Sequence, residues 1–247
     1  MIRRRLLPAL GVFLASVLGP LSVFAGDDAV ETGRLLAILL DAGRGAVAAN
    51  QPLINDASKG DKGFTPDVFA QQLAEKFKAR TGVDLGNLKT SGVPGSAQKL
   101  LPELVAAAKQ TVADNQATIN KPGVGYKGFT PAHFGTQTAA GFSAKTSIYM
   151  KQTTTDTLLR NPKNKADAFE AGMMKKLGDP GYPRQGDKIM SEPVGGDVRV
   201  MLPLFYGKGC MGCHGGPKGE TDVSGYKKEG ANEGDLGGAV SVKLPAK

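Results

Sequence analysis

A long internal repeat constrains the fold of this 247-residue chain more than any other feature. Residues 35–81 align without gaps with residues 100–146, and 22 of the 47 aligned pairs are identical. The shared positions include the pentapeptide KGFTP and the pair NQ. Chance does not produce this agreement, so the segment was duplicated and both copies are expected to fold alike.

Each copy is predicted to form a helix, a polar connection and a second helix. Leucines recur at helical spacing between residues 35 and 40. Thr65 or Thr130 is placed to cap the second helix, and Pro66 or Pro131 to occupy its first turn. The second helices carry matching stripes that favour a core position: Phe69, Leu73 and Phe77, then Phe134, Thr138 and Phe142. Residues 86–98 are predicted to link the copies.

The pattern changes to strands after the second copy. A turn at residues 161–164 and a helix carrying Ala168, Phe169, Met173 and Leu177 come first. Three segments then cluster β-branched residues between Gly and Pro: DKIMSEP, DVRVMLPLFYG and GGAVSVKLP. Helices followed by strands with short connections predict an α+β domain around an antiparallel sheet.

The first 25 residues are typical of a secretory signal peptide. Three arginines precede an apolar run, and Ala25 stands before a charged segment. Gly19 and Pro20 interrupt the run, which is shorter than the roughly 20 residues of a membrane span, so a retained anchor is the weaker alternative. We expect cleavage near Ala25 and export to a Gram-negative periplasm.

The charge of the chain excludes one class of partner. Removing the three arginines of the signal peptide lowers the formal charge from +8 to +5. No dense basic stripe with interleaved aromatic residues accompanies this charge, so nucleic acid is not an expected partner. A mildly basic surface suits an acidic redox partner or an anionic small molecule.

The motif CMGCH at residues 210–214 contains both cysteines of the chain. Two thiols on one turn can add across the two vinyl groups of a haem, and His214 then lies under the iron as its proximal ligand. A thioredoxin-like pair and a zinc site are the rivals. The first usually opens a helix after a strand, whereas Cys210 and Cys213 lie among glycines, and zinc needs about four ligands.

The opposite ligand of the iron is less constrained. His133 is the only other histidine, and Val68 occupies its position in the first copy. His133 is therefore a candidate distal ligand, and the alternative is a polar residue on an exposed helix face. The other options are an open site or one of the methionines outside the motif: Met150, Met173, Met174, Met190 and Met201.

Four further residues are candidates for contacts with the haem. Arg160 and Arg184 could pair with propionates, because a planar guanidinium matches a carboxylate. Tyr206 and Tyr226 bracket the motif and could donate to a propionate or pack on the haem edge.

The stretch from about residue 128 to the end resembles a family of periplasmic c-type haem domains with a PAS-like fold. The likeness rests on KGFTP at 127–131, LLRNPKNKADAFE at 158–170, CMGCHG at 210–215, Tyr226, and GDLGGAVSV at 234–242. Members occur alone or as extracytoplasmic sensor parts of histidine kinases. The resemblance implies one covalent haem c on Cys210, Cys213 and His214, packed against a PAS-like antiparallel sheet flanked by helices.

The chain departs from this family in two ways. Some members take a distal cysteine from the N-terminal helix, but both copies lack one there. The duplication also lies outside the simplest family pattern. The predicted organisation is a signal peptide (1–25), a first copy with its linker (26–98) and a haem domain that includes the second copy (99–247).

The motif and the family resemblance leave three functions open. A periplasmic monohaem cytochrome c could transfer electrons or respond to redox state, with a redox partner protein, a membrane sensor or a respiratory complex as partner. A haem-based gas or redox sensor signalling through a partner is the alternative. A peroxidase-like enzyme is the least favoured, because no second member of an acid/base site accompanies His133.

Overall fold

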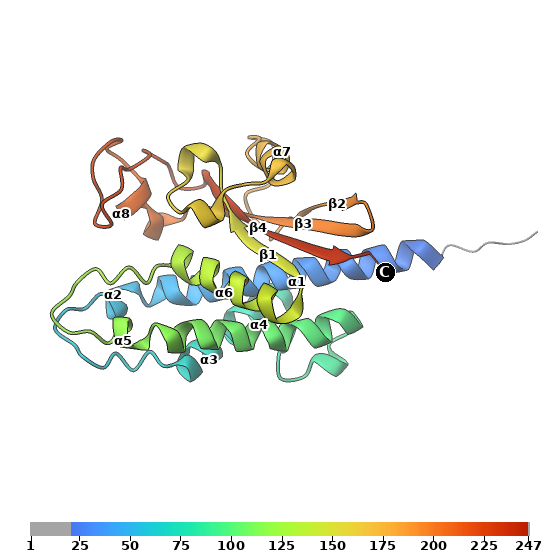
Figure 1. Cartoon of the computed structure of the whole chain (residues 1–247), viewed down its shortest axis with the longest axis horizontal. Coiled ribbons are helices and arrows are strands. Elements are labelled where there is room, and N and C mark those ends of the chain that lie inside the picture. The colour runs from blue at the N-terminus through green and yellow to red at the C-terminus, as the bar shows by residue number, and fades with distance from the viewer. Residues whose placement is uncertain (1–20, 247) are drawn as a thin grey trace, which may run out of the picture.

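The computed structural model describes the backbone of residues 21–246 and the side chains of residues 26–246. It has three layers (Figure 1): a bundle of helices from both copies, a four-stranded antiparallel sheet on the bundle, and α7 (Ala168–Leu177) on the far face of the sheet. The predicted α+β class, with an antiparallel sheet flanked by helices, is confirmed. The predicted signal peptide lies outside the residues whose side chains are described, and its cleavage stays a prediction.

The two copies fold alike, as the repeat predicts. Each forms a long helix, a single helical turn and a second long helix. In the first copy these are α1 (Leu21–Ala49), α2 (Gln51–Ile54) and α3 (Pro66–Thr81); in the second, α4 (Gly95–Asp114), α5 (Gln116–Ile119) and α6 (Pro131–Thr146). Helix α4 begins inside the segment 86–98 that was predicted as a linker, because Ala97 already packs in the core.

The predicted helix caps are confirmed in both copies. The Thr65 side chain accepts a hydrogen bond from the backbone N–H of Val68, and the Thr130 side chain accepts one from the backbone N–H of His133. Proline occupies the first turn of both helices. Local sequence therefore determines where each second helix begins.

Hydrogen bonds between the copies are made by side chains that the two copies share, the glutamine of the NQ pair and an asparagine four residues later. The Gln51 side chain donates to the Phe129 carbonyl at 2.8 Å, and the equivalent Gln116 donates to the Phe64 carbonyl at 3.3 Å. Likewise Asn55 accepts from the backbone N–H of Lys127, and Asn120 accepts from that of Lys62. Each copy thus satisfies backbone groups of the other, and the two copies pack as one bundle.

Aromatic residues fill the centre of the bundle. The Phe69 and Phe134 rings, equivalent in the two copies, lie 5.1 Å apart between centroids. Gly43 of α1 lies against this pair, since a Cβ atom there would come within 2.8 Å of the Phe134 ring. The glycine therefore allows α1 and α6 to approach closely.

The sheet has the order β1-β4-β3-β2, and every neighbouring pair is antiparallel. Its strands are β1 (Tyr149–Thr153), β2 (Met190–Val194), β3 (Asp197–Phe205) and β4 (Leu236–Pro245). The last three match the predicted segments. Strand β1 was not predicted, because YMKQT has two long polar side chains and few β-branched residues to mark it.

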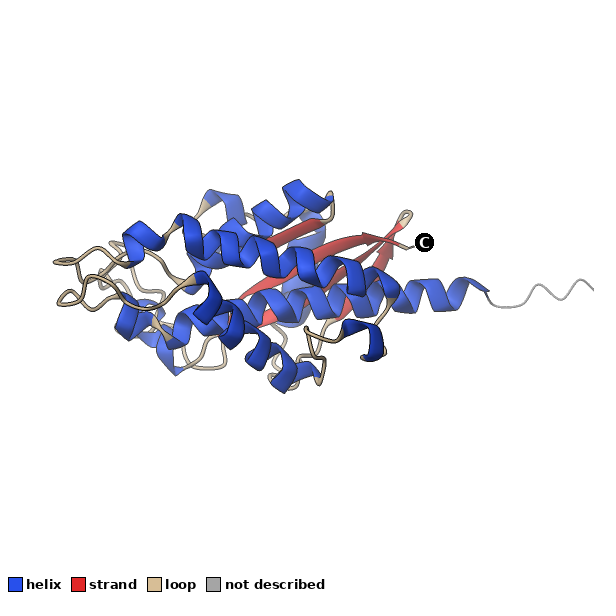
Figure 2. Cartoon of the chain, turned by 90° about the horizontal axis from the view of Figure 1, so that it is seen from below, coloured by secondary structure: helices blue, strands red, loops and turns tan. Residues whose placement is uncertain are grey.

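The two faces of the sheet have different covers. Seen from below (Figure 2), the helices of the bundle cover one face. Leu202 and Leu204 of β3 point into the bundle core, whereas Met201, the residue before Leu202, joins Met173 and Met174 of α7. This alternation is that of a strand buried on both faces. Within residues 21–246, no helix has the length and apolar character that a membrane span requires.

Candidate functional site

The CMGCH motif lies immediately after β3, at one end of the sheet (Figure 1). A 3₁₀ turn, Lys208–Cys210, leads into a single helical turn, α8 (Met211–His214). Cys210 and Cys213 are three positions apart on this turn and therefore lie on one side of it. Both thiols are free and partly exposed.

The His214 ring is held through one of its two nitrogens. Its Nδ1 atom lies 2.9 Å from Oε2 of Glu229 and 3.2 Å from the Tyr206 hydroxyl. The Tyr206 ring also stacks on the imidazole, with 4.6 Å between centroids. Because an ionised carboxylate only accepts hydrogen bonds, Nδ1 carries the proton and Nε2 keeps its lone pair for a metal.

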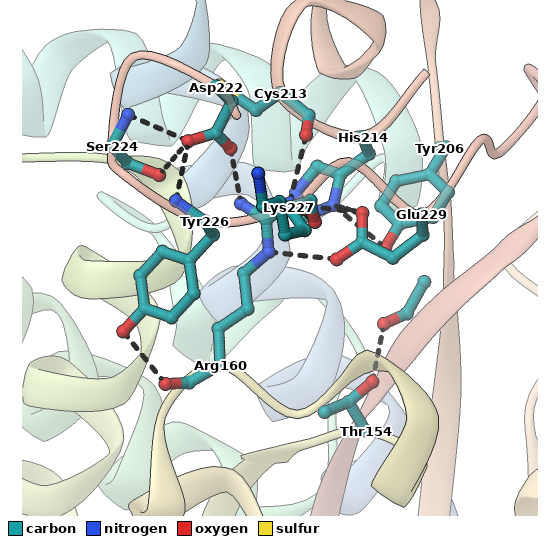
Figure 3. A network of polar contacts seen from close by, with 11 residues as sticks. Thr154, Arg160, Tyr206, Cys213, His214, Asp222, Ser224, Tyr226, Lys227 and Glu229 are labelled. Atoms are coloured by element: carbon teal, nitrogen blue, oxygen red, sulfur yellow. Dashed lines mark hydrogen bonds and ion pairs between the residues drawn. The ribbon is translucent and has the colours of Figure 1, made fainter. Parts of the chain in front are cut away.

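Arg160 joins the motif to the segment that follows it (Figure 3). Its guanidinium donates to both carboxylate oxygens of Glu229, at 2.9 and 3.0 Å, and to Asp222 at 2.7 Å. It also donates to the backbone carbonyl of Cys213 at 2.9 Å. The guanidinium therefore fixes the carboxylate that contacts His214 and the backbone of the motif together.

Both carboxylates around Arg160 are held ionised. Burial opposes ionisation of Glu229, but hydrogen bonds from Arg160 and His214 outweigh it and lower the pKa of this carboxyl. Burial also opposes ionisation of Asp222, yet bonds from Ser224 and Arg160 lower its pKa to about 2. The site thus contains fixed negative charges beside one fixed positive charge.

Two neutral groups complete the surroundings of the motif. Burial, with a contribution from the charge of Glu229, raises the pKa of Tyr206 to about 12. Burial and the charge of Asp222 raise the pKa of Cys213. Both groups therefore stay protonated near neutral pH, and Cys213 is present as a thiol.

Tyr126, in the loop of the second copy, lies near the motif. The pKa of its hydroxyl is raised, mainly by burial. A hydrogen bond with the Ser224 side chain lowers this pKa, and the neighbouring Cys213 raises it. Asp61 occupies the equivalent position in the first copy. The second copy therefore places a tyrosine near Ser224 and Cys213 at a position where the first copy has an aspartate.

Sequence reasoning had named some of these residues with other partners. Arg160 bonds to Glu229 and Asp222, and the Tyr226 hydroxyl donates to the Arg160 backbone carbonyl at 3.0 Å. Pairing of Arg160, Tyr206 or Tyr226 with a propionate stays a prediction. Arg184 lies elsewhere, where it donates to backbone carbonyls at the end of α7.

Three contributors to the site were missed: Glu229, Asp222 and Tyr126. Glu229 and Asp222 belong to residue types that are common on protein surfaces, and no local pattern marks them. A comparison of the copies could have found Tyr126, because it replaces Asp61 just before KGFTP.

His133 lies on the first turn of α6 and is exposed. Its ring is 6.0 Å from that of Phe129 between centroids. Although the residue is exposed overall, partial burial of its side chain, then the charge of Lys163, lowers its pKa. Among the described residues, no hydrogen bond, ion pair or ring contact joins His133 to residues 210–214. Its assignment as a distal ligand stays a prediction.

The methionines serve mainly as core residues. Four of the five candidates, Met150, Met173, Met174 and Met201, are at most 4% exposed, and Met190 packs beside them. For the zinc alternative, residues 21–246 contain no group of three or more His, Cys, Asp or Glu side chains arranged to hold a metal ion.

Among known proteins, one family model matches nearly the whole chain. The crystal structure of the cyanobacterial heme-protein Tll0287 is similar over 61% of this chain and 93% of its own, at 14% identity and a TM-score of 0.41. No curated protein sequence matches. The model of the Tll0287-like family, described as Tll0287, matches residues 25–245, which extends the predicted resemblance to the first copy. The chain belongs to the Tll0287-like family.

Proposed function

We propose that this chain is an exported monohaem cytochrome c that transfers electrons or responds to redox state. One observation carries the proposal. Nδ1 of His214 is bonded to Glu229, so Nε2 is the nitrogen left to bind iron, and two free thiols lie on the same turn. Cysteine, cysteine and histidine in this arrangement are the donor set of a covalently attached haem.

Attachment of a haem would use the two thiols of the motif. Each thiol would add across one vinyl group, so that a C–S bond would replace the C=C π bond and the thiol hydrogen would end on the neighbouring carbon. When bound, the haem supplies a one-electron couple. The chain supplies two free, partly exposed thiols, of which that of Cys213 has a raised pKa, and one oriented imidazole.

His133 is the distal ligand that we propose. Residues 160–164 connect it to the motif: Arg160 donates to the Cys213 carbonyl, and the Thr136 hydroxyl, on the same helix as His133, donates to Asn164 at 2.9 Å. One short segment thus contacts both the motif turn and the helix that presents His133. This supports a haem position between them.

Electron transfer or a redox response is favoured over catalysis by the placement of charge. The charged side chain that contacts His214 lies on its Nδ1 side, away from the nitrogen that would bind iron. Glu229 and Arg160 bond to one another there. They are placed to support a ligand and not to move protons at the opposite face of a haem.

A sensor that signals through a partner is the second candidate. Tyr206, which stacks on His214, directly follows β3. Its ring also lies against Gly237 of β4, where a Cβ atom would come within 2.6 Å of it. A movement of His214 would therefore reach two central strands of the sheet.

The compartment and partners follow from the sequence. A signal-peptide pattern before residue 26 supports export to the periplasm, and a charge of +5 after its removal supports an acidic redox partner. That partner would be a soluble redox protein, a membrane sensor or a respiratory complex, and the chain would meet the membrane only through it.

The test is an optical spectrum of the protein expressed with haem c maturation machinery, in both oxidation states, with and without carbon monoxide. The variants are His133→Ala and, as a control at the equivalent position of the first copy, Val68→Ala. We expect a low-spin wild type that does not bind carbon monoxide, a His133→Ala variant that does, and a control like the wild type.

Other outcomes separate the alternatives. A wild type that binds carbon monoxide readily has an open or weakly held distal site, which would overturn His133 as the ligand and favour gas sensing. Haem that is lost on denaturation, or no haem at all, would overturn covalent attachment. Cys210→Ala together with Cys213→Ala shows the spectrum and mass expected without thioether bonds.

A further inference from the structure

The contact between His214 and Glu229 suggests how the chain adjusts an iron bound at the motif. A hydrogen bond from Nδ1–H to a carboxylate makes the other ring nitrogen more electron-rich. Such a ligand stabilises ferric iron more than ferrous iron. The acceptor on Nδ1 therefore affects the reduction potential.

We propose that Glu229 is a positioning residue that orients the His214 ring through Nδ1 and lowers the reduction potential of iron bound at Nε2. This rests on the proposed haem function. Glu229 is 15 residues beyond His214, and its Oε2 lies 2.9 Å from Nδ1. Its side chain is only 15% exposed, so little water competes for the contact.

Arg160 makes the Glu229 carboxylate a fixed acceptor. Two of its nitrogens bind the two carboxylate oxygens, and a third contact ties it to fully buried Asp222. A bidentate guanidinium fixes both the position and the orientation of a carboxylate. Glu229 therefore cannot turn away from His214 without breaking the pair with Arg160.

Tyr206 is the competing partner of Nδ1, and the structure separates its role from that of Glu229. Its hydroxyl lies farther from Nδ1, at 3.2 Å, and it is neutral. Its ring stacks on the imidazole with an interplanar angle of 25°. We assign the electronic effect to Glu229 and the packing of the ring to Tyr206.

The test compares the reduction potentials of the covalent haem protein and four variants. Glu229→Gln removes the charge, and Glu229→Asp keeps the charge but withdraws the carboxylate from Nδ1. We expect both to raise the equilibrium constant for reduction about tenfold, which is about 59 mV for one electron. Tyr206→Phe keeps the stacked ring and should change the constant much less.

Glu233→Gln is the matched charge control. Glu233 is an exposed residue of the same segment, four positions beyond Glu229. Its removal reports how far the loss of any nearby negative charge shifts the potential. If Glu229 acts through Nδ1, its variants shift the reduction potential clearly more than Glu233→Gln does. Equal shifts would overturn the proposed role.

Nitrogen-15 NMR of the protein without haem gives a second readout. In the wild type, His214 should be in the tautomer with the proton on Nδ1, and Glu229→Asp should reduce its population. A tautomer that does not respond would contradict the positioning role even if a variant matured poorly. Circular dichroism of each variant checks that the fold is retained.

Haem attachment and the role of Glu229 are tested separately. If the wild type takes up no covalent haem, the proposed function fails and this inference falls with it. If the wild type carries haem but the Glu229 variants have its potential, only the role of Glu229 is wrong.

Discussion

The guanidinium of Arg160 lies 2.7 Å from the carboxylate of Asp222, a side chain with no exposed surface. Sixty-two residues separate the two in sequence. The same carboxylate accepts backbone hydrogen bonds from Ser224 and Tyr226. The Asp222 carboxylate therefore stabilises the turn at residues 222–226. It also binds Arg160, the arginine that donates to the backbone of the motif.

Replacing Asp222 should strongly lower the free energy of unfolding. Asp222→Asn leaves Arg160 facing a neutral group in a buried position, and breaking a buried pair costs about 3–5 kcal/mol. We expect about 3 kcal/mol in the free energy of unfolding, measured with urea, because Arg160 keeps Glu229. Glu220→Gln, which removes a more exposed ion pair with Lys228, should cost under about 1 kcal/mol. Similar losses in both variants would contradict a special role for Asp222.

The stability of the protein should fall at acidic pH partly through Asp222. Its pKa falls from 3.8 to about 2 because hydrogen bonds from Ser224 and Arg160 outweigh burial. A lowered pKa means that folding stabilises the ionised form, so this stability is present above about pH 4 and is lost as pH falls toward 2.

Urea unfolding of the wild type and Asp222→Asn between pH 2 and 7 checks this expectation. The difference between the two proteins should be constant above about pH 4 and shrink below it. A difference that stays unchanged down to pH 2 would show that Asp222 acts without its charge.

Two glycines of α1 should respond oppositely to alanine. A Cβ atom at Gly43 would meet the Phe134 ring at 2.8 Å, whereas at Gly45 the nearest atom, in Lys76, is 3.8 Å away. We expect Gly43→Ala to destabilise by about 1–3 kcal/mol through overpacking. Gly45→Ala should stabilise by up to about 1 kcal/mol, since alanine favours a helix.

Thermal unfolding of the two alanine variants measures this contrast. Because the substitution and the helix are the same, helix propensity cancels in the comparison. A Gly43→Ala variant as stable as Gly45→Ala would mean that α1 and α6 are not in close contact.

The crossed hydrogen bonds between the copies should contribute measurably. Gln51→Ala removes a donor from the Phe129 carbonyl and should cost about 1 kcal/mol. Gln116→Ala should cost less, because its bond to the Phe64 carbonyl is longer. Gln71→Ala, an exposed glutamine bonded only along its own helix to Glu75, is the control.

Urea unfolding of the three glutamine variants ranks these effects. The order Gln51, Gln116, Gln71 from largest to smallest loss is expected. A Gln71→Ala variant that loses as much as Gln51→Ala would show that the contacts between the copies add no stability of their own.

Much of the fold was predictable because its signals are local. Thr65 and Thr130 cap helices through neighbouring backbone groups, and each strand with clustered β-branched residues was recognised. Strand β1 was missed because its pairing with β4, about 90 residues later, and not its own composition, makes it a strand.

Part of the candidate site was likewise predictable from local sequence, and part was not. Cys210, Cys213 and His214 are recognisable because attachment of a haem needs them on one turn. Glu229 is 15 residues away from His214 and lies in a loop with no regular pattern. Only a folded chain shows which of its acidic residues reaches the imidazole.

The sequence by itself determined the duplicated helical copies, the α+β class and the donor set of the motif, since periodicity, caps and spacing act over a few residues. The tertiary structure alone decided how the copies interlock and which nitrogen of His214 is left free. Those outcomes depend on hydrogen bonds between Gln51 and Phe129, and between His214 and Glu229, whose partners meet only when distant segments pack together.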